Sequence, residues 1–129
     1  MTNLYLDKKL EFSENQAITG TAESENALDF GVENGSAAGK AIDIRIKEDF
    51  IGGTSLQFVL QDSADGVSYT DKLTSLTFQT TQLKAKGEDV FYSLAIPKGL
   101  RRFIRLKYAV TGTFTKGKVH AILNTEVRV

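Results

Sequence analysis

The stretch Arg101–Val110, RRFIRLKYAV, alternates between two kinds of side chain. One row is apolar and holds Ile104, Leu106, Tyr108 and Val110. The other row is basic and aromatic and holds Arg101, Phe103, Arg105 and Lys107. Successive side chains of a β-strand point to opposite faces, so this pattern predicts a strand with one face on a core. The basic row then lies on the outer face, where it is solvated, in contact with a protein partner or in contact with nucleic acid.

The same two-residue period occurs in four other stretches, namely KAIDIRIKEDF (40–50), SLQFVLQ (55–61), DVFYSLAI (89–96) and GKVHAILNTEV (117–127). Such alternation is typical of antiparallel strands that cover a core on one side. The predicted core rows are Ile42, Ile44 and Ile46; Leu56, Phe58 and Leu60; Val90, Tyr92, Leu94 and Ile96; and Val119, Ala121 and Leu123.

Segments rich in Gly, Asn, Asp or Pro separate these stretches and predict turns. They fall at 31–40, 51–55, 61–68, 84–89, 97–99 and 111–118. The intervals between them are about 8 to 15 residues, which is the spacing of β-sandwiches and barrels. The only helical feature that we expect is a short turn near 70–76. The pattern predicts one all-β antiparallel domain over 1–129, with 2–16 as an edge strand or an arm.

Composition limits the functional classes. The 129 residues suit one domain, and the 16 basic residues balance the 16 acidic ones. A neutral chain lacks the basic excess of most nucleic-acid-binding domains, and no apolar run reaches the length of a membrane span. The absence of cysteine excludes disulfides and Cys-based zinc sites. The start of the chain does not have the order of a signal peptide, so we expect synthesis in the cytoplasm without Sec export.

The sequence offers no frame for catalysis or for a cofactor. His120 is the only histidine, and it lies on the polar row of its predicted strand. The segment DSADG (62–66) lacks the ligand spacing of an EF-hand, since its twelfth position is Leu73. The segment GVENGSAAGK (31–40) lacks the order of a phosphate-binding loop. We therefore predict no enzyme, no catalytic residues, no cofactor and no metal.

The predicted outer face of 101–110 is a candidate interface. Phe103 lies between the arginines on that face, and Val59 and Phe91 also fall opposite the apolar rows of their strands. If the strands are neighbours, these three residues form an apolar patch bordered by charge, as in many interfaces. We predict Phe103 as the anchor, with Arg101, Arg102 and Arg105 pairing with acidic groups of a partner. The alternative is that a loop of the same chain covers Phe103.

The N-terminal segment 2–16 is also predicted to be ordered, either in the sheet or against a neighbour. Leu4 and Leu6 share one phase of the alternation, and Leu10 and Phe12 continue it. Leu4 and Leu6, together with Phe91, are therefore added to the candidate interface.

The segment Leu56–Thr70, LQFVLQDSADGVSYT, has a sequence pattern similar to one found in many carbohydrate-binding sandwiches. Sugar sites use exposed aromatic platforms, but this chain has no tryptophan and only four tyrosines. A carbohydrate- or receptor-binding β-sandwich is therefore the alternative function and not the leading one.

Three segments in order resemble the small cement, or decoration, proteins of tailed-phage capsids. They are NLYLDKKLEFSENQAITGTAESENALDFG (3–31), LQFVLQDSADG (56–66) and IPKGLRRFIRLKYAVTGTFTKGKVHAIL (96–123). The N-terminal signature of the family matches at Leu6, Asp7, Leu10, Phe12, Ser13, Gln16, Ala17, Thr19, Asp29 and Gly31.

The resemblance implies a jelly-roll-like β-sandwich that binds the outside of an HK97-type shell and bridges neighbouring capsid subunits. It implies the major capsid protein as partner, a location on the capsid surface of the virion, and a homo-oligomer, with a dimer favoured over a trimer. It implies no enzymatic activity, no cofactor and no contact with nucleic acid or membrane.

Overall fold

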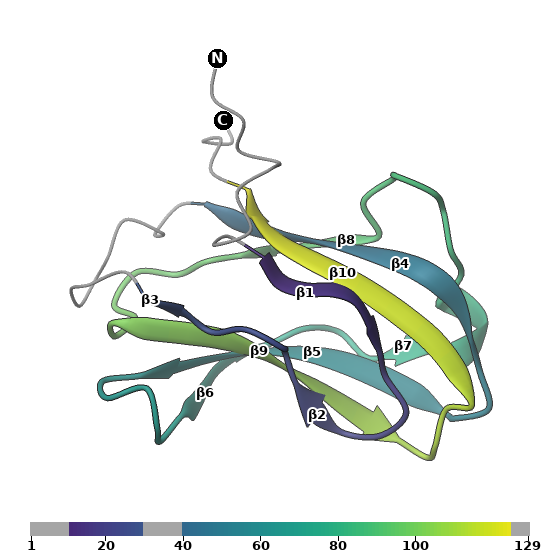
Figure 1. Cartoon of the computed structure of the whole chain (residues 1–129), viewed down its shortest axis with the longest axis horizontal. Helices are drawn as coiled ribbons and strands as arrows, with labels where there is room; N and C mark the ends of the chain where they lie inside the picture. The colour runs from purple at the N-terminus through teal and green to yellow at the C-terminus, as the bar shows by residue number, and fades with distance from the viewer. Residues whose placement is uncertain (1–10, 30–39, 125–129) are drawn as a thin grey trace.

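The computed structural model describes residues 11–29 and 40–124, which form two antiparallel β-sheets packed face to face (Figure 1). A 3₁₀ turn at Thr80–Gln82 is the only helical element in this part of the chain. The strands are β1 (Glu11–Ala17), β2 (Ala22–Glu23), β3 (Leu28–Asp29), β4 (Ala41–Ile51), β5 (Ser55–Ser63), β6 (Thr70–Thr74), β7 (Phe78–Gln79), β8 (Tyr92–Ala95), β9 (Phe103–Thr111) and β10 (Lys116–Asn124).

The strand order is that of a jelly roll. One sheet runs β1-β10-β4-β8 and the other runs β2-β9-β5-β6. Strands β2 and β3 both pair with β9, so together they count as one interrupted strand. Strands β6 and β7 both pair with β5, so they count as another. When the eight resulting strands are counted along the chain, the first sheet has the order 1-8-3-6 and the second has the order 2-7-4-5. This arrangement confirms the predicted antiparallel, jelly-roll-like sandwich.

The core between the sheets is built from the alternating rows that the sequence predicts. On β9, Ile104, Leu106 and Tyr108 have no exposed surface, and Val110 is half-buried near the end of the strand. The predicted apolar residues of β4 and β10 are also buried. At about 25 cal/mol per Å² of buried apolar surface, these rows are the main source of stability.

Two local predictions are wrong. The expected helical turn at 70–76 is instead the edge strand β6, which pairs with β5 from Val59 to Asp62. Backbone hydrogen bonding to a neighbouring strand overrides the weak local preference there. The row that begins at Val90 is also shorter than expected, because β8 starts only at Tyr92 and the Val90 side chain is exposed.

The hydroxyl of Tyr108 connects the two sheets inside the core. It lies 2.6 Å from Oγ of Ser13 on β1, and that Ser13 hydroxyl donates to Gln16 Oε1 at 2.6 Å. Tyr108 is therefore the donor to Ser13. Burial raises the pKa of Tyr108, against the smaller opposing effect of the Ser13 hydrogen bond, so the hydroxyl stays protonated.

We expect Tyr108→Phe to lower the free energy of unfolding by about 1–2 kcal/mol, because it removes one buried hydrogen bond and leaves the Ser13 oxygen without its donor. Urea unfolding followed by circular dichroism measures the change. Tyr92→Phe is the matched control, since the Tyr92 hydroxyl bonds to no residue in 11–29 or 40–124. Equal effects of the two substitutions would contradict the role assigned to Tyr108.

Candidate partner-binding surface

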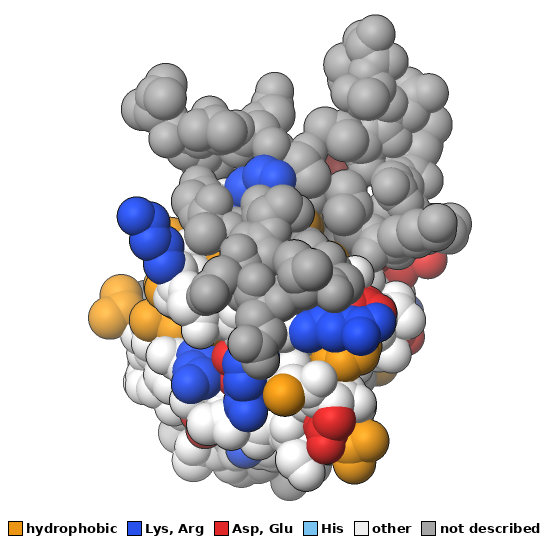
Figure 2. All heavy atoms as spheres, turned by 90° about the vertical axis from the view of Figure 1, so that its left-hand side faces the viewer, with side chains coloured by type: hydrophobic (Ala, Val, Ile, Leu, Met, Phe, Trp, Pro, Cys, Tyr) orange, Lys and Arg blue, Asp and Glu red, His pale blue; other side chains and the backbone are white. Residues whose placement is uncertain are grey.

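The predicted interface residues at 101–105, at the start of β9 and just before it, lie at one end of the sandwich, beside the turn that joins β5 to β6 (Figure 1). Figure 2 shows this end, where Lys and Arg side chains gather around the surface with hydrophobic side chains between them. Their contacts decide which of them are available to a partner.

Arg101 forms an ion pair within the chain. Its Nε and Nη2 atoms donate to Oδ1 of Asp62 at 3.2 and 2.9 Å, and its backbone N–H donates to Oδ2 at 2.8 Å. The Asp62 side chain is fully buried. Burial by itself raises the pKa of Asp62, but the hydrogen bonds and charge of Arg101 outweigh it, so the pKa lies below its ordinary value. Arg101 thus stabilises the junction of β5 and β9.

Arg102 and Phe103 also have partners in the chain. Arg102 Nε and Nη2 donate to the two carboxylate oxygens of Asp29 at 2.7 and 2.9 Å, in an exposed pair. The Arg102 guanidinium lies 4.9 Å from the centre of the Phe103 ring. Gly66 of the β5–β6 turn lies against the same ring, and a Cβ added there would be 3.5 Å from it.

The geometry therefore matches the alternative for Phe103, whose half-buried ring lies against a turn of its own chain. The acidic groups that we assigned to a partner are supplied internally for Arg101 and Arg102. Contact of these residues with a second protein remains a prediction.

The expected patch of Phe103, Val59 and Phe91 does not form. Val59 faces outward on β5, but only 4% of it is exposed. Phe91 precedes β8 in the other sheet, and its ring packs 4.9 Å from that of Phe78. Val59 and Phe103 lie on neighbouring strands of one sheet, but Val59 is covered and Phe91 belongs to the other sheet.

Two contacts within the chain hold the Arg105 side chain in place. Its guanidinium stacks 3.9 Å from the centre of the Tyr69 ring, and its Nε donates to Gln61 Oε1 at 2.7 Å. Gln61 in turn donates to Asp71 at 2.7 Å. The terminal nitrogens of Arg105 make no hydrogen bond to another residue that the structure describes. An arginine fixed in this way loses little entropy on binding, and Arg and Tyr are enriched at interface hot spots.

The turn beside Arg105 exposes a valine. Asp65 accepts hydrogen bonds from the backbone N–H groups of Val67 and Ser68 at 2.9 and 3.1 Å, and from the hydroxyl of Ser63 at 2.9 Å. These bonds lower the pKa of Asp65 to about 2. They hold the Val67 side chain outward, with 79% of the residue exposed.

Sequence analysis identified this turn correctly but missed Val67 and Tyr69 as surface residues. The sequence feature that could have identified Val67 is its position as an apolar residue directly after the Asp-Gly pair of a turn. We call Val67, Tyr69 and Arg105 the Arg105 surface.

The remaining predicted residues are quickly placed. Leu4 and Leu6 lie outside the described residues. His120 lies on the outer face of β10, where its Nε2 is 3.3 Å from Oε2 of Glu11.

Within 11–29 and 40–124, no three His, Asp or Glu side chains are grouped closely enough to hold a metal ion. In the same ranges, no helix is long and apolar enough to cross a membrane.

A family model named Bbp16 matches residues 12–123. The chain belongs to the Bbp16 family. The match runs from Phe12 in β1 to Leu123 in β10, so the Bbp16 family model covers both sheets and the Arg105 surface. No curated protein matches the chain.

Proposed function

We propose that this chain is a non-enzymatic capsid decoration protein that binds the outer surface of an HK97-type phage shell and bridges neighbouring capsid subunits. The observation that carries the proposal is the ordered set of cement-like motifs, which falls largely within the span of the Bbp16 match. The family name suggests a phage-related protein, and jelly rolls are common in capsid-associated proteins. The partner is the major capsid protein, and the chain acts on the virion surface as a homo-oligomer.

Bridging requires no chemistry, only surfaces that contact more than one subunit. Each contact can be weak, because simultaneous binding raises avidity by about 10²- to 10⁴-fold. The Arg105 surface supplies one such contact. Val67 offers apolar area, and the fixed guanidinium of Arg105 offers two hydrogen-bond donors to an acidic side chain of the shell.

The alternative, a carbohydrate- or receptor-binding accessory protein, is less well supported by this surface. A sugar platform requires an open aromatic face, whereas one face of Tyr69 is covered by the Arg105 guanidinium and the residue is half-buried. A glycan array tests this alternative directly.

We expect addition of this protein to raise the temperature at which capsids lose integrity. We expect Arg105→Gln to weaken capsid binding about 30-fold, which is the effect of losing a hot-spot contact of about 2 kcal/mol. Lys107→Gln, two residues along the same face, is the matched control and leaves binding within about 3-fold, as for a residue at the rim of an interface. Co-sedimentation with capsids measures the affinity.

Two results would count against these claims. Capsids equally heat-stable with and without the protein would remove the cement role. Stabilised capsids that bind Arg105→Gln like the parent would leave the role intact but exclude the Arg105 surface as the contact.

A further inference from the structure

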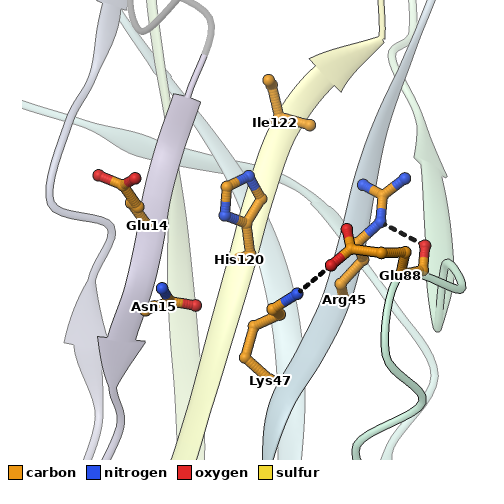
Figure 3. A pocket seen from close by; sticks show the side chains of 7 residues that line it. All are labelled: Glu14, Asn15, Arg45, Lys47, Glu88, His120 and Ile122. Carbon is orange, nitrogen blue, oxygen red and sulfur yellow. Dashed lines mark hydrogen bonds and ion pairs between the residues drawn. The ribbon is translucent and has the colours of Figure 1, made fainter. Parts of the chain in front are cut away.

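The outer face of the other sheet contains a polar hollow of about 380 Å³ (Figure 3). Three strands and a loop build it: β1, β4, β10 and the segment before β8. The core rows of β4 and β10 point the opposite way, so the hollow faces outward. Its lining residues are Glu14, Asn15, Arg45, Lys47, Glu88, His120 and Ile122.

Arg45 contributes a guanidinium that is only partly engaged. Its Nε donates to the backbone oxygen of Glu88 at 2.8 Å, which fixes the side chain. Its two terminal nitrogens point away from Lys47 in Figure 3 and form no hydrogen bond to another residue in the described ranges. This is the geometry that binds a carboxylate through two parallel hydrogen bonds.

His120 stands opposite Arg45 on the neighbouring strand. The nearly buried carboxylate of Glu11, 10% exposed, lies 3.3 Å from its Nε2 and restricts the ring. Ile122, two residues further along β10, adds an apolar side chain to the lining. The hollow therefore combines hydrogen-bond donors with an apolar contact for the stem of a side chain.

A bulge in β1 completes the wall. The pairing of β1 with β10 shifts between Ser13 and Gln16, and Asn15 adopts a left-handed backbone with φ of 49°. As a result, two consecutive residues, Glu14 and Asn15, both line the hollow. Bulges often redirect side chains next to functional sites.

The charges in the hollow stabilise a carboxylate. The pKa of Glu88 is lowered, first by its hydrogen bond from Lys47 at 3.0 Å and then by the charge of Lys47, with smaller effects of Arg45 and His120. Glu88 engages Lys47 and is otherwise exposed, with 87% of its side chain accessible. Glu88 is thus paired with Lys47, whereas the terminal nitrogens of Arg45 have no such pair within the described ranges.

We infer that this hollow binds a carboxylate side chain of a capsid subunit, with Arg45 as the bidentate donor and His120 beside it. The inference rests on the proposed function and extends it. The hollow lies on the outer face of one sheet and Arg105 lies on the outer face of the other, so the two surfaces can contact two different subunits. This placement is what a bridging protein requires, and the partner segment at the hollow contains Asp or Glu.

The test titrates the ¹⁵N-labelled full chain with acetyl-Gly-Glu-Gly-amide, and separately with the neutral peptide acetyl-Gly-Gln-Gly-amide. We expect saturable NMR shifts at Asn15, Arg45 and His120 with the acidic peptide only, and a Kd on the order of 1 mM. Arg45→Gln weakens binding at least about 10-fold, since it removes charge-assisted hydrogen bonds. Lys118→Gln, which removes the same charge from the same face outside the hollow, leaves the Kd unchanged.

Absence of saturable shifts, equal binding of the neutral peptide, or equal loss with Lys118→Gln would overturn the inference. Binding of inorganic phosphate at least as tight as that of the acidic peptide would overturn the choice of a carboxylate. Concentration-dependent shifts at the hollow without peptide would show a second copy of this chain as the occupant, and would also overturn it. The titration uses no capsids, so its failure is separate from failure of the decoration role.

Discussion

Replacing Arg101 with methionine is expected to lower the free energy of unfolding by about 3 kcal/mol at neutral pH. The substitution keeps an apolar stem but leaves the carboxylate of Asp62, which has no exposed side-chain surface, without its cation. Breaking a buried ion pair from one side costs about 3–5 kcal/mol. We expect the lower end, because 34% of the Arg101 side chain is exposed and water can replace it. Urea unfolding measures the loss.

Arg102→Met is the matched control, because it breaks an arginine–aspartate pair of similar geometry at the surface. Both side chains of that pair are almost half exposed, so the expected loss is about 0–1 kcal/mol. Equal losses in the two variants would show that burial of Asp62 contributes nothing.

The effect of Arg101→Met should also depend on pH. The pKa of Asp62 is lowered in the folded chain, so the pair contributes stability above the unfolded pKa of about 3.9 and loses it as pH falls through the folded value. The difference between parent and Arg101→Met therefore shrinks below about pH 4. A difference that stays constant down to strong acid would contradict an electrostatic origin.

Replacing Gly117 with alanine is expected to lower the free energy of unfolding by about 3–4 kcal/mol. Gly117 has a φ of 143°, which side chains of L-residues rarely adopt, and an added Cβ would lie 2.4 Å from the ring of Phe50. That ring is fully buried and packs edge-on against Phe114, with 4.8 Å between ring centres. Backbone strain and overpacking each cost about 1–3 kcal/mol. Thermal and urea unfolding measure the sum.

Gly20→Ala is the control for this position, since its added Cβ meets no atom within 4 Å, and a change within about 0.5 kcal/mol is expected. Adding Phe50→Leu to Gly117→Ala should recover at least about 1 kcal/mol relative to the sum of the single effects, because the smaller side chain relieves the contact. Strict additivity would show that the ring is not what excludes a side chain at Gly117.

The sequence alone was enough to predict the long strands β4, β5, β9 and β10 and the side chains that they direct into the core. The row Ile104, Leu106 and Tyr108 illustrates why, since the alternation of a strand is a local property and apolar burial selects the face. The turn at 62–66 could also be predicted from the sequence, because Asp and Gly determine the conformation of their own backbone. The jelly-roll order came from family resemblance, and no local rule supplies it.

Only the tertiary structure decided which outward residues are available to a partner. The alternation placed Arg101 and Arg105 on the same face. The fold brings the buried carboxylate of Asp62, 39 positions away, to Arg101, whereas Arg105 contacts only the neutral side chains of Gln61 and Tyr69 among the contacts found in the described ranges. The hollow around Arg45 could not be predicted from the sequence either, because its wall combines residues of β1, β4 and β10. Strand pairing between distant segments sets these contacts, and a period of two residues contains no information about which strands become neighbours.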